Sequence, residues 1–342
     1  MIRALLVAAI ALGLAGAGAF ARFERMDVLL EPDAAYTLPA GAGPLRVLSD
    51  LTDAGVIADD VRWRAWLALR KPAGCLQAGH HTLPAAATPA ELFAALCQPT
   101  RAPDVALTLT EGETLFAFAG RLAEAGFASS EDAALELAFS EAFADELGVP
   151  STTLEGYVFP DTYRFAEDAS ARDVFARMVA HGQEVRGEVF ESTPRTPFAD
   201  ELGLSDADLV TIASIVEREA AVPDEEPIIA RVVYNRLRRG MKLQMDPTCV
   251  YDRALDGQAA SPETCRDPAS RYSTYVIEGL PPTPIGNPGR SALRATLAPA
   301  DDPDVLYFVA IGDGSGRHAF ADDYATHRAN VRALRERRAA ER

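Results

Sequence analysis

Lysine is almost absent from this chain of 342 residues: only Lys71 and Lys242 occur, and every other basic side chain is an arginine. With 33 basic and 50 acidic residues, the formal net charge is -17 at pH 7. Nucleic-acid binding depends on clustered lysine and arginine that neutralise phosphates. The charge therefore argues against a nucleic-acid partner, and any anionic ligand must be held by local contacts rather than by long-range attraction.

Several motifs that carry common chemistry are missing as well. The five histidines show no H-E-x-x-H spacing and the four cysteines no C-x-x-C, so we expect no bound metal and no redox dithiol. There is no G-x-S-x-G, P-loop or dinucleotide fingerprint, and we expect no cofactor. The cysteines form two pairs that are close in sequence. In an oxidising compartment we expect disulfides Cys75–Cys97 and Cys249–Cys265, and the alternative is four buried free thiols.

The N-terminus holds the one long uncharged run, from Ala4 to Ala21 behind Arg3. Its length at the rise of an α-helix is about 27 Å, close to the thickness of a bilayer core. We therefore predict a transmembrane anchor at 1–25. A cleaved signal peptide is the alternative, because the small residues of "AGAGAFA" suit cleavage and the arginines after the run leave the positive-inside rule undecided. In both interpretations, the rest of the chain is exported across the membrane.

Two segments of the chain align without a gap at an offset of 71 residues. The matched positions are Gly41, Leu51 and Gly55 with Gly112, Leu122 and Gly126. Each segment indicates a short strand, a glycine turn and an amphipathic helix that ends at a glycine, with a second helix behind it. We predict a first strand–helix module at 26–100 and a second, similar to small wall-binding LysM modules, at 101–150.

The rest of the chain predicts an α+β domain. Helices are indicated near 170–190, 205–222, 223–239 and 324–342, and residues 151–165 indicate a loop bounded by short strands. A strand, a turn and a short helix are expected in 241–252. A long loop of prolines and glycines follows in 272–289, and then a hairpin that begins with the apolar run "VLYFVAI".

The segment "ASIVEREA", residues 213–220, places two glutamates in an apolar helix. The apolar stripe of this helix consists of Leu209, Ile212, Ala213, Val216 and Ala220. Glu217 and Glu219 fall on its two flanks, each roughly 70–90° from its centre, and Arg218 is expected to point to water. A glutamate at such a boundary is more often a salt-bridge partner. However, a carboxyl beside apolar groups has a raised pKa, which a general acid needs near neutral pH.

Five segments occur in an order and spacing that resemble the YceG-like family of endolytic murein transglycosylases. They are "LEGYVFPDTYRF", "ASIVEREA", "VVYNRLRRGMKLQMDPT", "YSTYVIEGLPPTPIGNPG" and "LYFVAIGDGSGRHAF". The resemblance runs from the anchor to about residue 335. It implies an N-terminal membrane helix, a LysM-like part and an α+β catalytic domain at 151–335. Thr283 stands where the family usually has glycine, and "PAGAGP" departs from the usual first turn, which leaves loop detail open.

The resemblance also implies an activity. The family cuts nascent peptidoglycan strands between N-acetylmuramic acid (MurNAc) and N-acetylglucosamine (GlcNAc) without water, and leaves a 1,6-anhydro-muramyl end. Its catalytic glutamate matches Glu217, which would act first as acid and then as base. The implied location is the bacterial inner membrane, with a single span and the catalytic part in the periplasm. The implied partners are glycan strands and peptidoglycan synthases, the penicillin-binding proteins.

Further residues match the family pattern around the cleft. The expected supporting or substrate-binding positions are Glu219, Asn235, Gln244, Asp246, Thr248, Tyr275 and Asn287. For Glu219, Asn235 and the loop around Asn287, a structural role is an equal alternative. Glu155 with Asp161 could form a paired-carboxylate site, but the turn-forming context favours a structural role. His318 and His327 also match family positions, and a lone histidine is more often structural.

Two other functions stay open at this stage. One is a non-catalytic scaffold that binds peptidoglycan within the cell-wall synthesis machinery. The other is hydrolysis with a second carboxylate, which would give products heavier by one water. The complete motif around Glu217 favours the transglycosylase.

Overall fold

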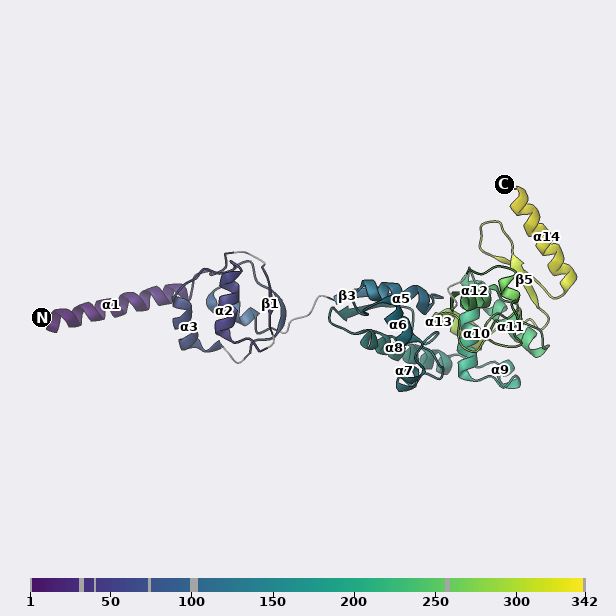
Figure 1. Cartoon of the computed structure of the whole chain (residues 1–342), viewed down its shortest axis with the longest axis horizontal. Helices are drawn as coiled ribbons and strands as arrows, with labels where there is room; N and C mark the ends of the chain where they lie inside the picture. Colours follow the sequence, from purple (N-terminus) through teal and green to yellow (C-terminus); the bar gives the residue numbers. More distant parts are fainter. Residues whose placement is uncertain are drawn as a thin grey trace. The chain divides into compact units, whose positions relative to one another are not determined.

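The computed structural model describes residues 2–30, 34–39, 41–72, 75–98, 104–255 and 259–340, without the side chains of 2–12, 104 and 253. Its contacts divide the chain into two compact units, Met1–Asp104 and Val105–Arg342, each with an apolar core of its own. The elements are helices and two-stranded sheets (Figure 1). The α+β class predicted from the sequence is therefore confirmed.

The first unit contains one small antiparallel sheet and four helices among its described residues. They are α1 (Ile2–Phe23), β1 (Ala35–Leu38), α2 (Pro44–Asp53), α3 (Arg62–Arg70), β2 (Gly79–Thr82) and α4 (Pro89–Ala95). β1 pairs with β2 so that Tyr36 lies opposite His81. Rings from three helices, Phe23, Trp63, Trp66 and Phe93, form the centre of the core. The end of α1 is thus part of the folded unit.

The second unit begins with a strand and two helices that repeat the order of β1, α2 and α3. It contains β3 (Asp104–Thr108), α5 (Leu115–Glu124), α6 (Glu131–Ala138), α7 (Glu141–Glu146) and β4 (Thr162–Ala166), with β3 paired to β4. Helices α2 and α5 begin and end 71 residues apart. The turn glycines Gly41 and Gly112 have φ of 74° and 72°, a conformation that glycine adopts without strain. The predicted repeat is confirmed, whereas its likeness to LysM modules stays a prediction.

The remainder of the second unit is built around one buried helix. Its elements are α8 (Ala171–Ser192), α9 (Pro197–Glu201), α10 (Asp206–Glu219), η2 (Pro223–Glu225), α11 (Glu226–Arg238), α12 (Asp246–Leu255), η3 (Thr264–Arg266), α13 (Arg290–Leu297), β5 (Tyr307–Ala310), β6 (His318–Ala321) and α14 (Tyr324–Ala340). Helix α10 packs against α11, α12 and α13 (Figure 1). The predicted hairpin β5–β6 and the terminal helix α14 are confirmed.

One local expectation was wrong, and another was incomplete. Residues 241–245 do not form a strand, because Gln244 has a left-handed φ of 51° that interrupts an extended run. The burial of α10 also extends beyond the single apolar stripe that was predicted, since every residue from Leu209 to Val216 is buried. The burial arises because α11, α12 and α13 pack on different sides of α10. The periodicity of apolar residues along the sequence does not show such packing.

Among the described residues, no helix has the length and the apolar character needed to cross a membrane. The side chains of 2–12 lie outside the described part, and the predicted anchor at 1–25 stays a prediction. The predicted boundaries between 25 and 26 and between 150 and 151 also stay predictions. Both predicted disulfides, Cys75–Cys97 and Cys249–Cys265, are present.

Candidate active site

Helix α10 carries Glu217 and Glu219 in its last turn. It begins with a capping box, in which the Ser205 hydroxyl accepts from the Asp208 N–H (3.2 Å) and the Asp208 carboxylate accepts from the Ser205 N–H (2.8 Å). The buried stretch that follows fixes the orientation of the helix in the core. Because the two glutamates are two residues apart, their side chains leave the helix roughly 200° apart. They therefore enter different surroundings.

Glu217 lies against the backbone of two glycines. Its Oε2 accepts a hydrogen bond from the N–H of Gly289 at 2.9 Å. Its Cγ lies 3.3 Å from the point where a Cβ on Gly112 would stand. Burial raises the pKa of Glu217 to about 7, the carboxylates of Glu111 and Glu226 add to the rise, and the Gly289 N–H opposes it. Near neutral pH this carboxyl can both donate and accept a proton.

The turn of the second module forms one wall around Glu217. The Gly112 N–H donates to the carbonyl of Asn287 at 2.8 Å, and the Gly112 carbonyl accepts from Nη1 of Arg218 at 3.1 Å. Arg218 is half-buried rather than directed to water, so that expectation was wrong. Burial lowers the pKa of the Arg218 guanidinium, and the carboxyl of Glu155 opposes this effect. These bonds connect the turn at Gly112 to α10 and to the loop at 272–289, and they hold the three segments in place.

Asn287 is the centre of a buried hydrogen-bond network. Its Nδ2 donates to the carbonyl of Glu113 and to Oε1 of Glu155, both at 2.9 Å, and its Oδ1 accepts from the N–H of Gly156 at 2.9 Å. Glu155 also accepts from the N–H of Leu115, the first residue of α5, at 3.1 Å. Burial raises the pKa of Glu155 to about 8. These contacts favour the structural alternative for Asn287 and for Glu155.

Glu155 and Asp161 contact different partners. Asp161 is exposed and lies 3.3 Å from Nε2 of His181, whereas Glu155 is fully buried in the Asn287 network. A paired-carboxylate site requires both groups on one substrate bond. The geometry therefore favours the structural interpretation of this pair.

Glu219 lies in a second cluster, on the α12 side of α10. Burial raises its pKa to about 8, and the negative charge of Asp246 adds to the rise, while Arg236 and Arg218 oppose it. The backbone N–H of Asp246 also donates to the Glu219 carboxyl. The Asp246 carboxylate accepts from the Tyr275 hydroxyl at 2.5 Å. Three predicted residues from separate segments are thus brought together.

The segments around Gln244 and Tyr275 are joined at several points. The Gln244 N–H donates to the carbonyl of Thr274 at 3.1 Å, and the side chain of Gln244 is exposed. Thr248 is buried, and its hydroxyl accepts from the Thr274 N–H at 3.0 Å and donates to the Met245 carbonyl at 2.6 Å. Thr248 therefore stabilises the junction between these two segments, whereas Gln244, Asp246 and Tyr275 can reach a ligand.

Asn235 lies apart from both glutamate clusters. Its Nδ2 donates to the carbonyls of Asp302 and Val305, at 3.0 and 2.8 Å, and the side chain is buried. These bonds connect α11 to the segment before β5. The structural alternative is favoured for Asn235.

The two matched histidines also have structural contacts. The His318 Nδ1 lies 2.7 Å from Oε2 of Glu225. The ring of His327 stacks on Tyr307, and burial lowers its pKa. Among the residues that the structure describes, no group of three or more histidine, cysteine or acidic side chains could hold a metal ion.

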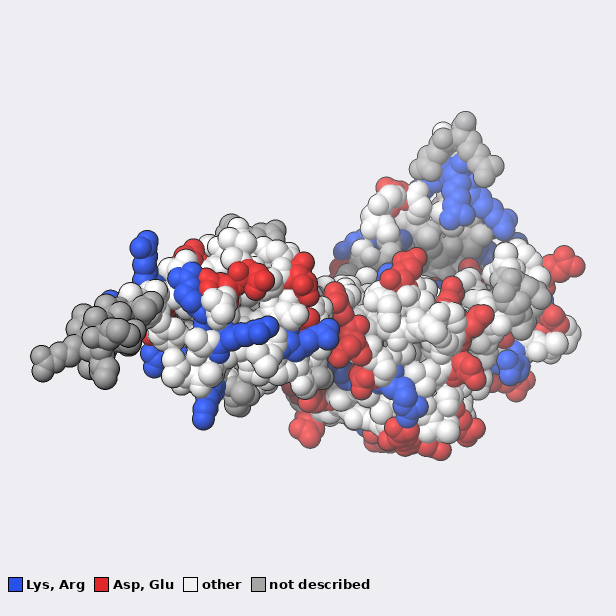
Figure 2. Space-filling model, turned by 60° about the vertical axis from the view of Figure 1, so that its left-hand side comes forward, with Lys and Arg blue, Asp and Glu red and all other residues white. Residues whose placement is uncertain are grey.

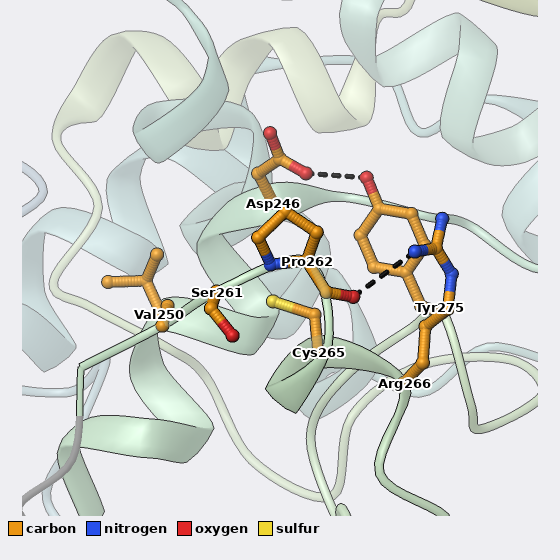
Figure 3. Close-up of a pocket in the computed structure, with 8 residues that line it drawn as sticks. Asp246, Val250, Ser261, Pro262, Cys265, Arg266 and Tyr275 are labelled. Carbon is orange, nitrogen blue, oxygen red and sulfur yellow. Dashed lines mark hydrogen bonds between the residues drawn. The ribbon is translucent and has the colours of Figure 1, made fainter.

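A cavity of about 290 Å³ opens beside the Glu219 cluster (Figure 3). The residues that line it include Asp246 and Tyr275, which were predicted, and Arg266, which was not. Sequence reasoning also missed Glu111, Gly112 and Gly289 around Glu217. Gly112 carried a signal, because it aligns with Gly41 in the repeat, but nothing local shows that its turn packs on α10.

The chain was compared with known proteins. The model of the YceG-like family matches residues 36–333. A Bacillus subtilis protein named endolytic murein transglycosylase is 30% identical over 324 residues, which cover 87% of this chain and 85% of that protein. A protein of the same name from Streptococcus pneumoniae is 33% identical over 184 residues, 52% of this chain and 32% of its own length. The crystal structure of a YceG-like protein from Listeria monocytogenes has a TM-score of 0.56 at 26% identity, and the match covers 86% of this chain and 98% of that one.

Proposed function

The chain belongs to the YceG-like family, and from this premise we propose that it is an endolytic peptidoglycan lytic transglycosylase. It cleaves the bond between MurNAc and GlcNAc inside nascent glycan strands and leaves a 1,6-anhydro-muramyl end. Family membership and the curated relatives support the enzyme class. The proposal goes beyond that class in naming the anhydro product and in naming Glu217 as the catalytic residue.

The observation that carries the proposal is the environment of Glu217. A carboxyl that acts first as acid and then as base works best when its pKa is close to the working pH. Burial and two neighbouring carboxylates place the pKa of Glu217 at about 7. The N–H of Gly289 stabilises the ionised form at 2.9 Å. Both protonation states are therefore accessible without a partner acid.

One carboxyl group serves both steps of the reaction, first as an acid and then as a base. Protonated Glu217 donates its proton to the glycosidic oxygen, the bond from that oxygen to C1 of the muramyl residue breaks, and positive charge develops on C1 and the ring oxygen. The Glu217 carboxylate then removes the proton from the C6 hydroxyl of the same sugar. The C6 oxygen bonds to C1 and closes the anhydro ring. Glu217 ends protonated, and no water is consumed.

The neighbouring carboxylates favour these two proton transfers through their negative charge. Glu111 and Glu226 contribute negative charge beside Glu217, and the Ser291 hydroxyl donates to Glu226. Negative charge that is already in place stabilises a positively charged transition state. The same charge favours the protonated form of Glu217 before the reaction starts.

The setting of the activity is part of the proposal. The uncharged run near the N-terminus anchors the chain in the bacterial inner membrane, the catalytic part lies in the periplasm, and the enzyme works beside peptidoglycan synthases. Two disulfides support export, because such bonds persist in oxidising compartments.

The test is cleavage of purified uncrosslinked glycan strands by the full chain in detergent, with products identified by mass spectrometry. The full chain is used because Phe23 of α1 belongs to the core of the first unit. Glu217→Gln is expected to lower the turnover rate by about 10²–10⁴-fold, the usual contribution of a general acid or base. Glu136→Gln, on an exposed face of α6, is the control and is expected to match the wild type.

Three results would contradict the proposal. Anhydro-ended fragments from Glu217→Gln at the wild-type rate would remove Glu217 from the mechanism. Products heavier by one water, about 18 Da, would indicate hydrolysis with a second carboxylate. Retention of strands without cleavage by the wild type would favour the peptidoglycan-binding scaffold.

A further inference from the structure

The cavity beside Glu219 has no part in the proton transfers described above. Two segments that are joined by the Cys249–Cys265 disulfide form much of its wall. Figure 3 shows Tyr275 and Arg266 on the right and Val250 on the left, with Asp246, Pro262 and Cys265 between them. Its volume of about 290 Å³ is at the low end of the range of ligand pockets, roughly 300–1,000 Å³. A short branch of a substrate fits such a space better than a whole glycan.

The lining combines one cation with an apolar wall. The Arg266 guanidinium lies over the Tyr275 ring, 5.8 Å from its centroid, and Nη1 donates to the Pro262 carbonyl at 3.1 Å. Arg266 is exposed, and it makes no ion pair among the described residues. Val250 is 45% exposed although it is a large apolar residue. Such a cavity suits a ligand with small apolar groups and a carboxylate.

The charge of the surroundings makes this arginine unusual. Residues 105–342 contain 40 acidic and 24 basic side chains. Figure 2 shows acidic side chains at many separate places on the face that it presents, with fewer basic ones among them. Among the described residues that line the cavity, Arg266 is the one basic side chain. A guanidinium binds a carboxylate through two parallel N–H···O bonds, so a single arginine can select an anionic group locally.

The cavity also borders the end of α10. Asp246, in its wall, donates its N–H to Glu219 and raises the pKa of that residue by its charge. Glu219 is two residues from Glu217 on α10. A branch of a sugar bound at Glu217 would therefore have to pass the end of α10 to enter the cavity.

We propose that this cavity binds the stem peptide of peptidoglycan, with Arg266 as the residue that recognises a peptide carboxylate. The inference rests on the proposed function, because the stem peptide is the short, alanine-containing, anionic branch that muramic acid carries. The apolar wall receives alanine methyl groups, and the guanidinium pairs with the carboxylate. Arg266 is thus a specificity-determining residue and takes no part in proton transfer.

The experiment compares two substrates with the full chain in detergent. One is uncrosslinked glycan strands with their stem peptides, and the other is the same strands after an amidase has removed the peptides. Arg266→Gln is expected to raise KM for peptide-bearing strands by about tenfold, the usual effect of losing one hydrogen bond to a charged group. It is expected to leave kcat and the cleavage of denuded strands unchanged. Arg271→Gln is the matched control, because Arg271 is exposed and does not line the cavity.

Each other outcome has a definite meaning. An equal loss on both substrates would show that Arg266 contacts sugar or supports the fold, and no change on either would show that the cavity is unused; both overturn the inference. If the wild type cleaves neither substrate, the proposed function fails. Calorimetric titration with a soluble stem tetrapeptide then decides the inference by itself. Binding to the wild type and to Arg271→Gln, with loss in Arg266→Gln, would support it, and no binding to the wild type would overturn it.

Discussion

At the scale of single residues, Glu217 shows how surroundings set a proton equilibrium. Burial and the charges of Glu111 and Glu226 favour the protonated carboxyl, whereas the N–H of Gly289 favours the ionised one. Glu219 has a similar rise in pKa, but it accepts from the N–H of Asp246 and is influenced by the charges of Asp246 and Arg236. A raised pKa alone therefore does not identify the acid. The backbone of Gly112 and Gly289 around Glu217 distinguishes the two sites.

The charge of Glu111 is expected to control the pH dependence of strand cleavage. Glu217 must begin protonated, so the rate should fall as pH rises through its pKa of about 7. Glu111→Gln removes a negative charge that raises this pKa, and the fall should move to lower pH. Well above the pKa, each unit of this movement reduces the protonated fraction about tenfold. The measurement is kcat/KM against pH, from pH 5 to 9.

Glu136→Gln, an equal loss of charge on an exposed face of α6, should leave that profile unchanged. A profile for Glu111→Gln that matches the wild type would contradict the role given to Glu111. A fall that moves to higher pH would contradict the sign of the effect.

The place of Glu217 and Glu219 on one helix could be predicted from periodicity, because that pattern depends on neighbours in sequence. Periodicity does not choose between the two glutamates, and the catalytic role of Glu217, which the family resemblance implies, stays a prediction. The roles of Asn287 and Asn235 could not be predicted. The Nδ2 of Asn287 donates to a carboxyl 132 residues away, and that of Asn235 donates to carbonyls 67 and 70 residues away. An asparagine side chain looks the same in sequence whether it binds a ligand or a distant carbonyl.

At the scale of elements, the second module's turn belongs to the site. Gly112 has a φ of 72° and lies against Glu217, and Gly41 has the equivalent place in the first module. The repeat could be predicted because glycine turns and apolar stripes are local patterns. The contact of the Gly112 turn with α10 could not be predicted, since it arises from tertiary packing. The all-round burial of α10 was hidden for the same reason.

The two turns provide a matched pair of substitutions. Alanine at either glycine must adopt a left-handed conformation, at a cost of about 1 kcal/mol. The added Cβ would lie 3.3 Å from the Glu217 Cγ in Gly112→Ala, whereas it would meet no atom within 4 Å in Gly41→Ala. We expect Gly112→Ala to lower kcat by tenfold or more, because small displacements of a catalytic group are costly. Gly41→Ala should keep the wild-type kcat.

Strand cleavage and thermal unfolding of both variants check this prediction. We expect both variants to lose a similar, small amount of stability. Only Gly112→Ala is expected to lose turnover. Equal turnover in the two variants would show that the turn at Gly112 does not position Glu217.

At the scale of the whole molecule, the two units differ in charge. Residues 1–104 carry ten acidic and nine basic side chains, and the acidic excess lies in residues 105–342. Both disulfides could be predicted, because each joins cysteines that are close in sequence, 22 and 16 residues apart. The division after Asp104 lies four residues from the predicted boundary between 100 and 101, but the partner of the second module could not be predicted. The repeat suggested two similar modules, whereas packing assigns the second module to the core that holds α10.

This division leads to a prediction about fragments. Gly112 lies against Glu217 and donates its N–H to Asn287, and the N–H of Leu115 donates to Glu155. Phe118 of α5 packs on Phe175 of α8 in the same core, 6.4 Å between ring centroids. A fragment 104–342 keeps all of these contacts, and we expect it to fold and to cleave soluble glycan strands at a rate close to that of the full chain.

A fragment 151–342 corresponds to the catalytic domain predicted from the sequence. It loses the turn at Gly112 and the N–H that Leu115 donates to Glu155, which leaves a buried carboxyl without one of its donors. It also exposes the face of α8 that α6 covers. We therefore expect it to unfold at a lower temperature or not to fold, and to lack strand cleavage. Cooperative unfolding and full activity of 151–342 would instead show that the boundary between 150 and 151 separates two independent domains.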